Sequence, residues 1–122
     1  MAKTIMIVDD SASMRQVVGI ALKSAGYDVI EGRDGVDALA KLTGQKVHLI
    51  ISDVNMPNMD GITFVAEVKK LPSYKFTPII MLTTESDENR KRAGQAAGAR
   101  AWVVKPFKPE QMLNAVQKLC LP

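Results

Sequence analysis

Hydrophobic residues in this chain follow two alternating patterns: short apolar runs, and longer stretches in which apolar residues recur at helical spacing. The runs predict five strands, at residues 4–8, 27–31, 47–52, 78–82 and 101–104. Four of these runs are almost continuously apolar, which is typical of strands that are covered on both faces of a parallel sheet. The run at 27–31 is more polar and indicates a strand at the edge of the sheet.

A stretch of helical periodicity follows each of these runs. In chain order these are the apolar face from Met14 to Leu22, residues 36–43, residues 61–71, residues 87–97, and the apolar face from Leu113 to Cys120. The first two are followed by Gly26 and Gly44, typical residues just beyond a helix C-terminus, and the third stops at Pro72. Strands that alternate with helices in this way predict right-handed crossovers and a three-layer α/β/α fold. We expect a single domain spanning residues 1–122.

The stretch at 87–97 differs from the others because its only apolar side chains are alanines. Ala93, Ala96 and Ala97 are available for its buried side, and Gly94 lies among them. Burial of alanine methyl groups contributes much less than burial of leucines, at ~25 cal/mol per Å². We therefore expect this helix to be the least firmly packed and the natural candidate for a part that moves.

The composition is that of one globular domain, with 122 residues, 47% hydrophobic and 24% charged. No apolar run approaches the ~18 residues of a membrane-spanning helix, no signal-peptide segment is recognisable, and the single cysteine, Cys120, cannot form an internal disulfide. We therefore expect a cytoplasmic protein without membrane insertion, and a monomer. The net charge of +3 is spread along the chain apart from residues 90–92, where no aromatic residues interleave, so nucleic-acid binding is not expected.

Three aspartates stand where apolar runs stop, and they are the first sign of chemistry. Asp9 and Asp10 follow the first run, and Asp53 follows the third. Alone, an aspartate after a strand is commonly a turn former or a helix N-cap. If the two runs are neighbouring parallel strands, however, three carboxylates meet at one sheet edge, where each pair repels by about 4 kcal/mol at an effective dielectric constant of about 20. A bound divalent cation is the simplest explanation for such a cluster.

Two further polar residues, Thr83 and Lys105, follow the fourth and fifth runs. In open parallel α/β sheets, ligands bind outside the carboxyl ends of the strands, so a hydroxyl and an ammonium group would join the acids there. Five polar residues at four strand ends are hard to explain by turn chemistry alone. They predict an acidic nucleophile site with the hydroxyl of Thr83 and the ammonium group of Lys105 beside it.

The combination of Asp9-Asp10, residues 53–61 with the sequence DVNMPNMDG, Thr83 and the Lys-Pro-Phe segment at 105–107 resembles the receiver domains of the response-regulator family. The resemblance covers essentially all 122 residues. Within the family, the chain most resembles the single-domain chemotaxis regulators. This resemblance implies the flavodoxin-like receiver fold, with five parallel strands in the order 2-1-3-4-5, and a cis peptide bond between residues 105 and 106.

The resemblance also implies a signalling protein of a two-component system, which catalyses only its own phosphorylation and dephosphorylation and is not otherwise an enzyme. Asp53 accepts a phosphoryl group from a sensor histidine kinase, and Thr83 and Lys105 hold the phosphoryl oxygens. The ligands that suit Mg²⁺ are Asp10 and Asp53 directly, Asp9 through water, and the main-chain carbonyl of Asn55. Asn55 and Glu85 flank the path of the hydrolysing water in this family, so we expect fast self-dephosphorylation that needs Mg²⁺.

In motor-binding members of the family, the output surface is the face of the fourth helix, fifth strand and fifth helix, and a tyrosine stands at the place of Trp102. We expect phosphorylation to draw the Thr83 hydroxyl toward the phosphoryl group and to change the environment of Trp102. The expected partners are a chemotaxis kinase, the flagellar motor switch protein and a phosphatase. A lone receiver can instead act as a phosphorelay intermediate or a phosphate sink, and the sequence leaves these roles open.

Two other classes of protein fit the residues less well. Aspartate-nucleophile phosphatases of the haloacid-dehalogenase type have a second acid where this chain has Asn55, and they are longer. Flavodoxin-like binders have a hydroxyl- and glycine-rich phosphate loop after the first strand, where Asp9 and Asp10 would repel phosphate. The only histidine, His48, begins the strand that Asp53 ends, roughly 17 Å away along an extended chain, so the phosphohistidine is expected in a partner.

Overall fold

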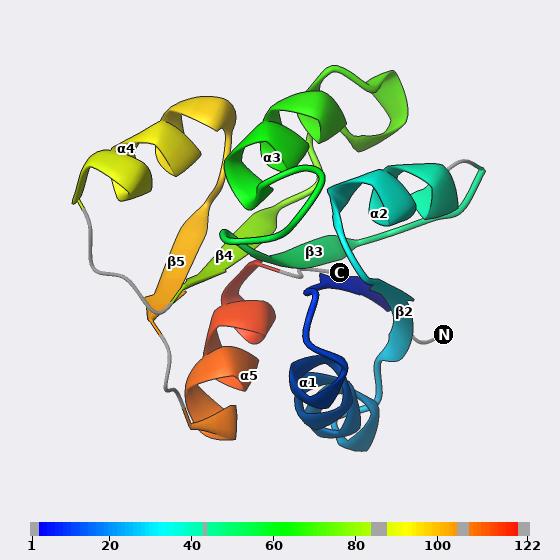
Figure 1. The fold of residues 1–122 in the computed structure, drawn as a ribbon. Helices are drawn as coiled ribbons and strands as arrows, with labels where there is room; N and C mark the ends of the chain where they lie inside the picture. The colour runs from blue at the N-terminus through cyan, green and yellow to red at the C-terminus, as the bar shows by residue number, and fades with distance from the viewer. Residues whose placement is uncertain (1–2, 43, 84–87, 105–107, 120–122) are drawn as a thin grey trace.

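The five apolar runs form the parallel sheet that their pattern predicts (Figure 1). The strands are β1 (Thr4–Val8), β2 (Asp28–Gly32), β3 (Leu49–Asp53), β4 (Ile79–Thr83) and β5 (Ala101–Val104). Their order is β2-β1-β3-β4-β5 and every neighbouring pair is parallel, which confirms the predicted fold class. The structure is a computed structural model that describes residues 3–42, 44–83, 88–104 and 108–119, and of residues 88–90 it describes the main chain only.

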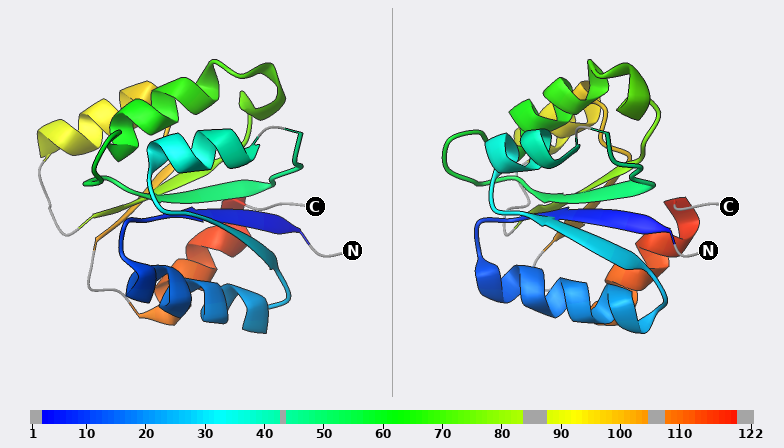
Figure 2. Two further views of the ribbon diagram at one scale, coloured as in Figure 1. Left: turned by 45° about the vertical axis from the view of Figure 1, so that its right-hand side comes forward. Right: turned by 90° about the vertical axis from the view of Figure 1, so that its right-hand side faces the viewer.

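Helices cover both faces of the sheet, as Figures 1 and 2 show. One face carries α1 (Ala12–Ser24) and α5 (Pro109–Leu119), and the other carries α2 (Gly35–Leu42), α3 (Gly61–Lys69) and α4 (Glu88–Ala97). Gly26 and Gly44, beyond α1 and α2, have φ values of 96° and 75°, which glycine adopts without steric cost. The third helix ends earlier than predicted, and Pro72–Tyr74 form a short 3₁₀ helix, η1. No helix in the described ranges is long and apolar enough to span a membrane.

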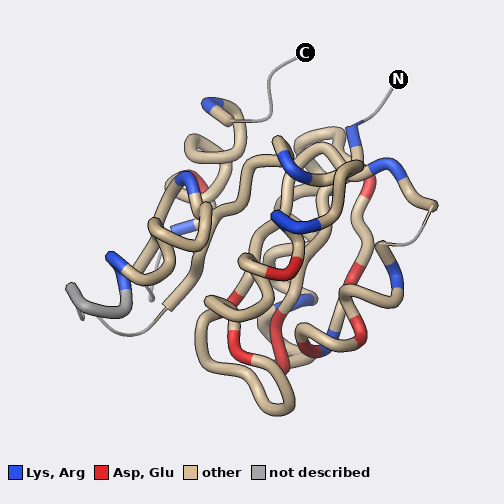
Figure 3. The backbone as a smooth tube through the Cα atoms, turned by 90° about the horizontal axis from the view of Figure 1, so that it is seen from above, with Lys and Arg blue, Asp and Glu red and all other residues tan. Residues whose placement is uncertain are grey.

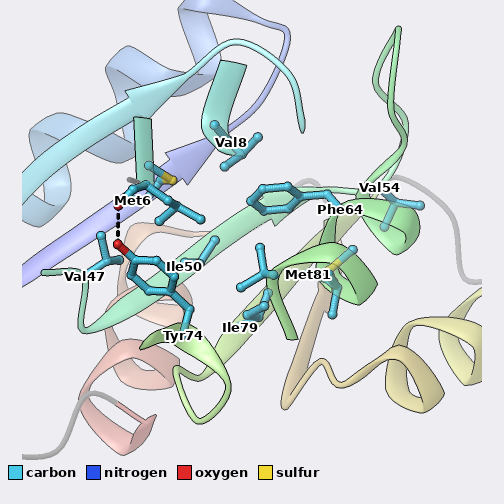
Figure 4. Close-up of a cluster of buried hydrophobic side chains, with 13 residues drawn as sticks. Met6, Val8, Val47, Ile50, Val54, Phe64, Tyr74, Ile79 and Met81 are labelled. Carbon is cyan, nitrogen blue, oxygen red and sulfur yellow. Dashed lines mark hydrogen bonds between the residues drawn. The ribbon is translucent and has the colours of Figure 1, made fainter. Parts of the chain in front are cut away.

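Alternate residues of the central strands contribute to two hydrophobic cores, one under each layer of helices. Met6 and Ile50 belong to the core under α2 and α3, where they pack with Phe64 (Figure 4). Ile5 and Ile51 belong to the opposite core, under α1 and α5. All of these side chains are fully buried. Because β1 and β3 are held from both sides, they give a fixed position to the residues at their carboxyl ends.

Two of the central strands, β3 and β4, extend one residue further than their apolar runs predicted, and both added residues are polar. Asp53 is the last residue of β3 and pairs in register with Leu82. Thr83 is the last residue of β4 and pairs with Val104. The main-chain ladder continues through these positions because its hydrogen bonds do not depend on side-chain polarity. Asp53 and Thr83 are therefore parts of the sheet itself and not of the loops that follow it.

The prediction for the buried side of α4 is wrong for Ala93 and Ala96 and correct for Ala97, which packs against the core. Ala93 and Ala96 are exposed, whereas Gly94 is buried and Ala97 is half-buried. A Cβ atom on Gly94 would lie 2.8 Å from Cζ3 of Trp102, so the absence of a side chain lets the helix approach the indole closely. The side of α4 that faces the protein therefore carries Gly94 against Trp102 and Ala97 against the core, next to α3.

Candidate functional site

The carboxyl ends of β1 and β3 bring Asp9, Asp10 and Asp53 together. The two strands are in register, with Val8 opposite Ser52, so the residues that come next lie side by side. One carboxylate oxygen from each of the three aspartates lies within 4.8 Å of the other two. Asp9 is 1% exposed and Asp53 is 7% exposed, whereas Asp10 is exposed. The mutual repulsion of three carboxylates at this separation favours a bound cation.

Asp9 is held by the main chain and by α1. Its Oδ1 accepts a hydrogen bond from the N–H of Ser11 at 2.9 Å, and its own N–H donates to the carbonyl of Gly32 at 3.1 Å. The carbonyl of Asp9 accepts from Nη1 of Arg15 at 2.6 Å, and Arg15 also forms an ion pair of 3.1 Å with Glu31. The turn after β1 is thereby tied to β2, which fixes the place of both acids on that turn.

Asp53 is held by the strand that it ends. Its Oδ1 accepts a hydrogen bond from the N–H of Val54 at 2.8 Å, and the same N–H donates to the carbonyl of Leu82 at 3.1 Å. The hydroxyl of Ser52 donates to the carbonyl of Asp53 at 2.9 Å. These contacts give the carboxylate a fixed direction at the end of a buried strand.

Gly61 allows the start of α3 to close against this strand. A Cβ atom there would lie 2.1 Å from the carbonyl oxygen of Asp53 and 2.9 Å from Cα of Val54, so no side chain fits. The N–H of Gly61 donates to the carbonyl of Val54 at 2.8 Å. Asp60 caps the helix by accepting from the N–H of Thr63 at 2.8 Å. The Asp-Gly pair of the sequence motif is therefore explained by packing and capping beside Asp53.

Thr83 lies at the same edge of the sheet, one strand away from Asp53. It is 1% exposed and follows Leu82, the residue that pairs with Asp53. The hydroxyl is thus carried by a strand end, as the sequence predicted. Other positions of the sequence analysis lie outside the described residues: Glu85, the Lys-Pro-Phe segment at 105–107, and Cys120.

The remaining residues of interest lie at the rim of the acidic cluster or away from it. Asn55 is exposed, near the start of the loop from β3 to α3. Trp102 is half-buried on β5. His48 precedes β3 at the opposite end of the sheet, where its Nδ1 accepts a hydrogen bond from the N–H of Thr4 at 3.0 Å. This bond gives His48 a structural partner at the end where the strands begin.

The sequence analysis did not single out Asp34 and Asn58, which join two loops beside the site. Nδ2 of Asn58 donates to Oδ2 of Asp34 at 2.9 Å, and Oδ1 of Asp34 accepts from the N–H of Asp37 at 2.8 Å. The hydrogen bond from Asp37, and then that from Asn58, hold the pKa of Asp34 below its ordinary value because they stabilise the carboxylate. The available signals were an aspartate just before a helix and an asparagine in a turn.

The donor set of the acidic cluster fits a hard divalent cation. All three donors are carboxylates, which are ligands of Mg²⁺ in proteins. Two oxygens bound to one Mg²⁺ at ~2.1 Å lie at most about 4.2 Å apart. Oxygens within 4.8 Å of one another therefore need only a small adjustment, or a water between one of them and the ion. Figure 3 shows further acidic positions around this end of the sheet, and their field attracts a cation.

A doubly wound parallel sheet with acids at the carboxyl ends of its central strands defines an α/β class whose ligands bind at that edge. The family model of the response regulator receiver domain matches residues 5–117, and the chain belongs to this family. Receiver domains are signalling proteins of two-component systems that interact with histidine kinases, and they are not enzymes in the ordinary sense.

The relatives include chemotaxis proteins and a magnesium-bound receiver. The structure of the chemotaxis protein CheY4 from Vibrio cholerae has a TM-score of 0.94 at 48% identity, covering 98% of this chain and 99% of that chain. Chemotaxis protein CheY1 from Helicobacter pylori is 38% identical over 115 residues, which are 93% of each chain. The receiver domain of the sensor histidine kinase PA1611 from Pseudomonas aeruginosa has a magnesium ion coordinated in its active site cleft; its TM-score is 0.90 at 26% identity, covering 98% of each chain.

Proposed function

We propose that this protein is a phosphorylation-activated response regulator, which accepts a phosphoryl group on Asp53 from the phosphohistidine of a sensor kinase and uses Mg²⁺ to do so. The observation that carries the proposal is the position of Asp53, buried at the end of β3 with its carboxylate beside those of Asp9 and Asp10. A carboxylate can attack a charged phosphoryl group only if the charges of both are offset. The neighbouring acids supply ligands for a cation that offsets them.

In the covalent step, a carboxylate oxygen of Asp53 attacks the phosphorus atom of the phosphohistidine. The new P–O bond forms as the P–N bond breaks, and the electron pair of the P–N bond stays on the imidazole nitrogen, which takes up a proton. The N–H of Val54, 2.8 Å from Oδ1, orients the carboxylate for this attack. The product is an acyl phosphate on Asp53.

In this proposal, Asp10 and Asp53 bind Mg²⁺ directly, Asp9 binds it through water, and the main-chain carbonyl of Asn55 is a further ligand. When bound, Mg²⁺ offsets the repulsion among the carboxylates and the charge on the transferring phosphoryl group. The contacts of Asp9 with Ser11 and Gly32 support this assignment, because they fix one carboxylate before any ion arrives.

Thr83 and Lys105 hold the phosphoryl oxygens in this proposal, through the hydroxyl and the ammonium group. Support for the role of Thr83 comes from its buried place at the end of β4, next to the strand that Asp53 ends. Asn55 and Glu85 flank the hydrolysing water and leave room for it. The phosphorylated state is then short-lived and its decay depends on Mg²⁺.

For the biological role, we propose chemotaxis and control of the flagellar motor, supported by the likeness to CheY4 and CheY1. The output surface is the face of α4, β5 and α5, which carries Trp102. A groove of about 410 Å³ between β5 and α5 is a binding site for a partner in this proposal. Its lining residues are Ala101, Trp102, Val103, Gln111, Asn114, Ala115, Lys118 and Leu119. The partners are a chemotaxis kinase, the motor switch protein and a phosphatase, and the protein acts as a cytoplasmic monomer.

The central test is phosphorylation by acetyl phosphate in the presence of Mg²⁺, followed by intact-mass measurement. Asp53→Asn is expected to abolish the acyl phosphate while leaving the fold intact, because the amide is nearly isosteric but poorly nucleophilic. Asp60→Asn is the matched control, since asparagine still caps α3, and it is expected to remain phosphorylated. A phosphoryl group found on another residue of Asp53→Asn would remove the proposal.

A second experiment separates the chemotaxis role from the relay role. The protein is presented with and without a beryllofluoride phosphoryl mimic to the purified motor switch protein. Binding that requires the mimic supports motor control. Absence of binding, together with onward transfer of phosphoryl to a histidine phosphotransfer domain, would favour the relay, and Trp102 in place of tyrosine is the observation that keeps this alternative open.

A further inference from the structure

The loop from β3 to α3 contains an unusual backbone conformation at Asn58. Its φ of 69° is the only positive value of a non-glycine residue in the part of the chain that the structure describes. Asparagine tolerates this left-handed region better than most residues, but glycine adopts it more easily. The turn alone therefore does not explain why a side chain is present at this position.

The side chain of Asn58 reaches across to the start of α2. Its Nδ2 donates to Oδ2 of Asp34 at 2.9 Å, while Oδ1 of the same carboxylate accepts from the N–H of Asp37 at 2.8 Å. Asp34 is only 7% exposed. One buried carboxylate thus has two tasks: it caps α2 with one oxygen and holds the loop after β3 with the other.

A second contact lies beside the first. A Cβ atom on Gly35 would lie 2.9 Å from both Cγ and Sδ of Met59, so this methionine packs directly against the glycine backbone. Two consecutive residues of the loop therefore rest on two consecutive residues at the start of α2. Figure 2 shows the green loop before α3 beside the cyan start of α2.

Other contacts fix the two ends of the loop. At one end, the N–H of Val54 donates to the carbonyl of Leu82 and so continues the sheet. At the other end, Gly61 donates to the carbonyl of Val54 at 2.8 Å. Asn55 lies between β3 and Asn58 in the chain. The strand therefore holds the loop before Asn55, and the contact with α2 holds it after Asn55.

We propose that Asp34 and Asn58 are positioning residues for the metal site, whose hydrogen bond holds the β3–α3 loop so that the main-chain carbonyl of Asn55 stays directed at the cation. This inference rests on the proposed function of the acidic cluster. It accounts for the occurrence of a buried carboxylate opposite a left-handed asparagine. Contacts of this kind, one step removed from the metal ligands, generally change metal affinity by roughly tenfold to 100-fold when they are lost.

The test is a double-mutant cycle on the affinity for Mg²⁺. Asn58→Gly removes the side chain and suits a positive φ, and Asp34→Ser keeps an N-cap for α2 but is too short to reach Asn58. In calorimetric titrations with Mg²⁺, each variant is expected to show a dissociation constant raised roughly tenfold. The double variant should lose little more than a single variant, because both changes remove the same bond. Losses that multiply, or dissociation constants within about twofold of wild type, would overturn the proposal.

Two controls separate this outcome from lost stability and from failure of the proposed function. Urea unfolding in the presence of EDTA is expected to show only a modest loss of stability for Asn58→Gly, because one hydrogen bond to a carboxylate is removed while glycine is unstrained at this φ. A large loss of stability with unchanged Mg²⁺ affinity would show a structural role instead. Asp10→Ala tests the acidic cluster: if it leaves Mg²⁺ affinity unchanged, the metal site is wrong, and if it alone weakens binding, the metal site stands and the positioning role is wrong.

Discussion

The central strands of the sheet and its β5 edge are packed to very different degrees. Nearly all residues of β1, β3 and β4 are buried, whereas the residues of β5 are half-buried and Val104 is 44% exposed. The helices follow the same trend: α3 buries Phe64, Val65 and Val68 in the core, while α4 meets β5 through Gly94. The acidic cluster therefore lies on the firmly packed side, which consists of β1, β3, β4 and α3. The proposed output surface lies on the loosely packed side, which includes β5 and α4.

This difference suits the two functions proposed for the protein, phosphoryl acceptance at the acidic cluster and signalling at the output surface. A phosphoryl acceptor needs fixed geometry, because small displacements of the reacting atoms are costly for catalysis. A signalling surface needs two accessible arrangements that differ by a small free energy. Thr83 connects the two sides, since it ends β4 beside the strand of Asp53 and pairs with Val104 of β5. A displacement of the Thr83 side chain is therefore expected to disturb β5 and α4 more than β1 and β3.

The largest effect is expected from Gly61→Ala, which attacks the firmly packed side. The added Cβ would lie 2.1 Å from the carbonyl oxygen of Asp53, a backbone atom that cannot move without disturbing β3. We expect the free energy of unfolding in urea to fall by about 3 kcal/mol or more, with loss of Mg²⁺ binding. Gly19→Ala is the matched control: its Cβ would meet Ile7 at an ordinary 3.8 Å, so it should stabilise α1 by up to about 1 kcal/mol. Equal effects of the two variants would contradict the packing argument.

Gly94→Ala makes the corresponding change on the loosely packed side. Its Cβ would lie 2.8 Å from Cζ3 of Trp102, which is the edge of a ring on a half-buried strand. Because the indole or α4 can shift, and alanine favours the helix, the net loss of stability should be only about 1 kcal/mol. The emission spectrum of Trp102 should nevertheless change.

Ala96→Gly provides the control for this second substitution. Ala96 is exposed, so its replacement should weaken α4 by up to about 1 kcal/mol without moving the indole. If both variants changed the Trp102 spectrum equally, general loosening of α4 would explain the result. If Gly94→Ala were as destabilising as Gly61→Ala, the two sides of the sheet would not differ as described.

A smaller effect is expected from a beryllofluoride mimic of the phosphoryl group. Amide hydrogen exchange in residues 88–104 should change by about threefold, corresponding to ~0.7 kcal/mol of local opening free energy, because β5 is only half-buried and the described side chains of α4 are mostly exposed or half-buried. Amides of β1 and β3 should change much less. Exchange that changes in the pocket loops while residues 88–102 stay unaffected would argue against the proposed output face.

The acidic cluster was predictable from the sequence because each acid follows an apolar run. Once the runs are neighbouring parallel strands, register alone brings Asp9 and Asp53 together. The contact between Asp34 and Asn58 was not predictable in this way, since it joins two loops 24 residues apart and leaves no local pattern. Part of the buried side of α4 was missed for a related reason: helical periodicity ranks residues by their own apolarity, whereas Gly94 is buried because it lies against Trp102, a neighbour on another element.

The smallest expected effect is a pH dependence of stability that originates at Asp34. The hydrogen bonds from Asp37 and Asn58 hold the folded-state pKa of Asp34 below the ordinary value of 3.8. The unfolded chain therefore binds more protons around that pH, so the stabilisation is fully present above the unfolded-state pKa and is lost as the pH falls through the folded-state pKa. The slope corresponds to at most about one proton.

Urea unfolding of wild type and Asp34→Ser from about pH 6 to about pH 2.5 measures this effect as a difference between the two proteins. The difference in free energy of unfolding should be constant at the upper end and shrink in acid. Asp37, whose pKa is also lowered, chiefly by the hydrogen bond from the N–H of Arg33, is present in both proteins and largely cancels. A difference that stayed constant into acid would mean that Asp34 is not a hydrogen-bonded anion. The contact between the β3–α3 loop and α2 through Asp34 would then be wrong.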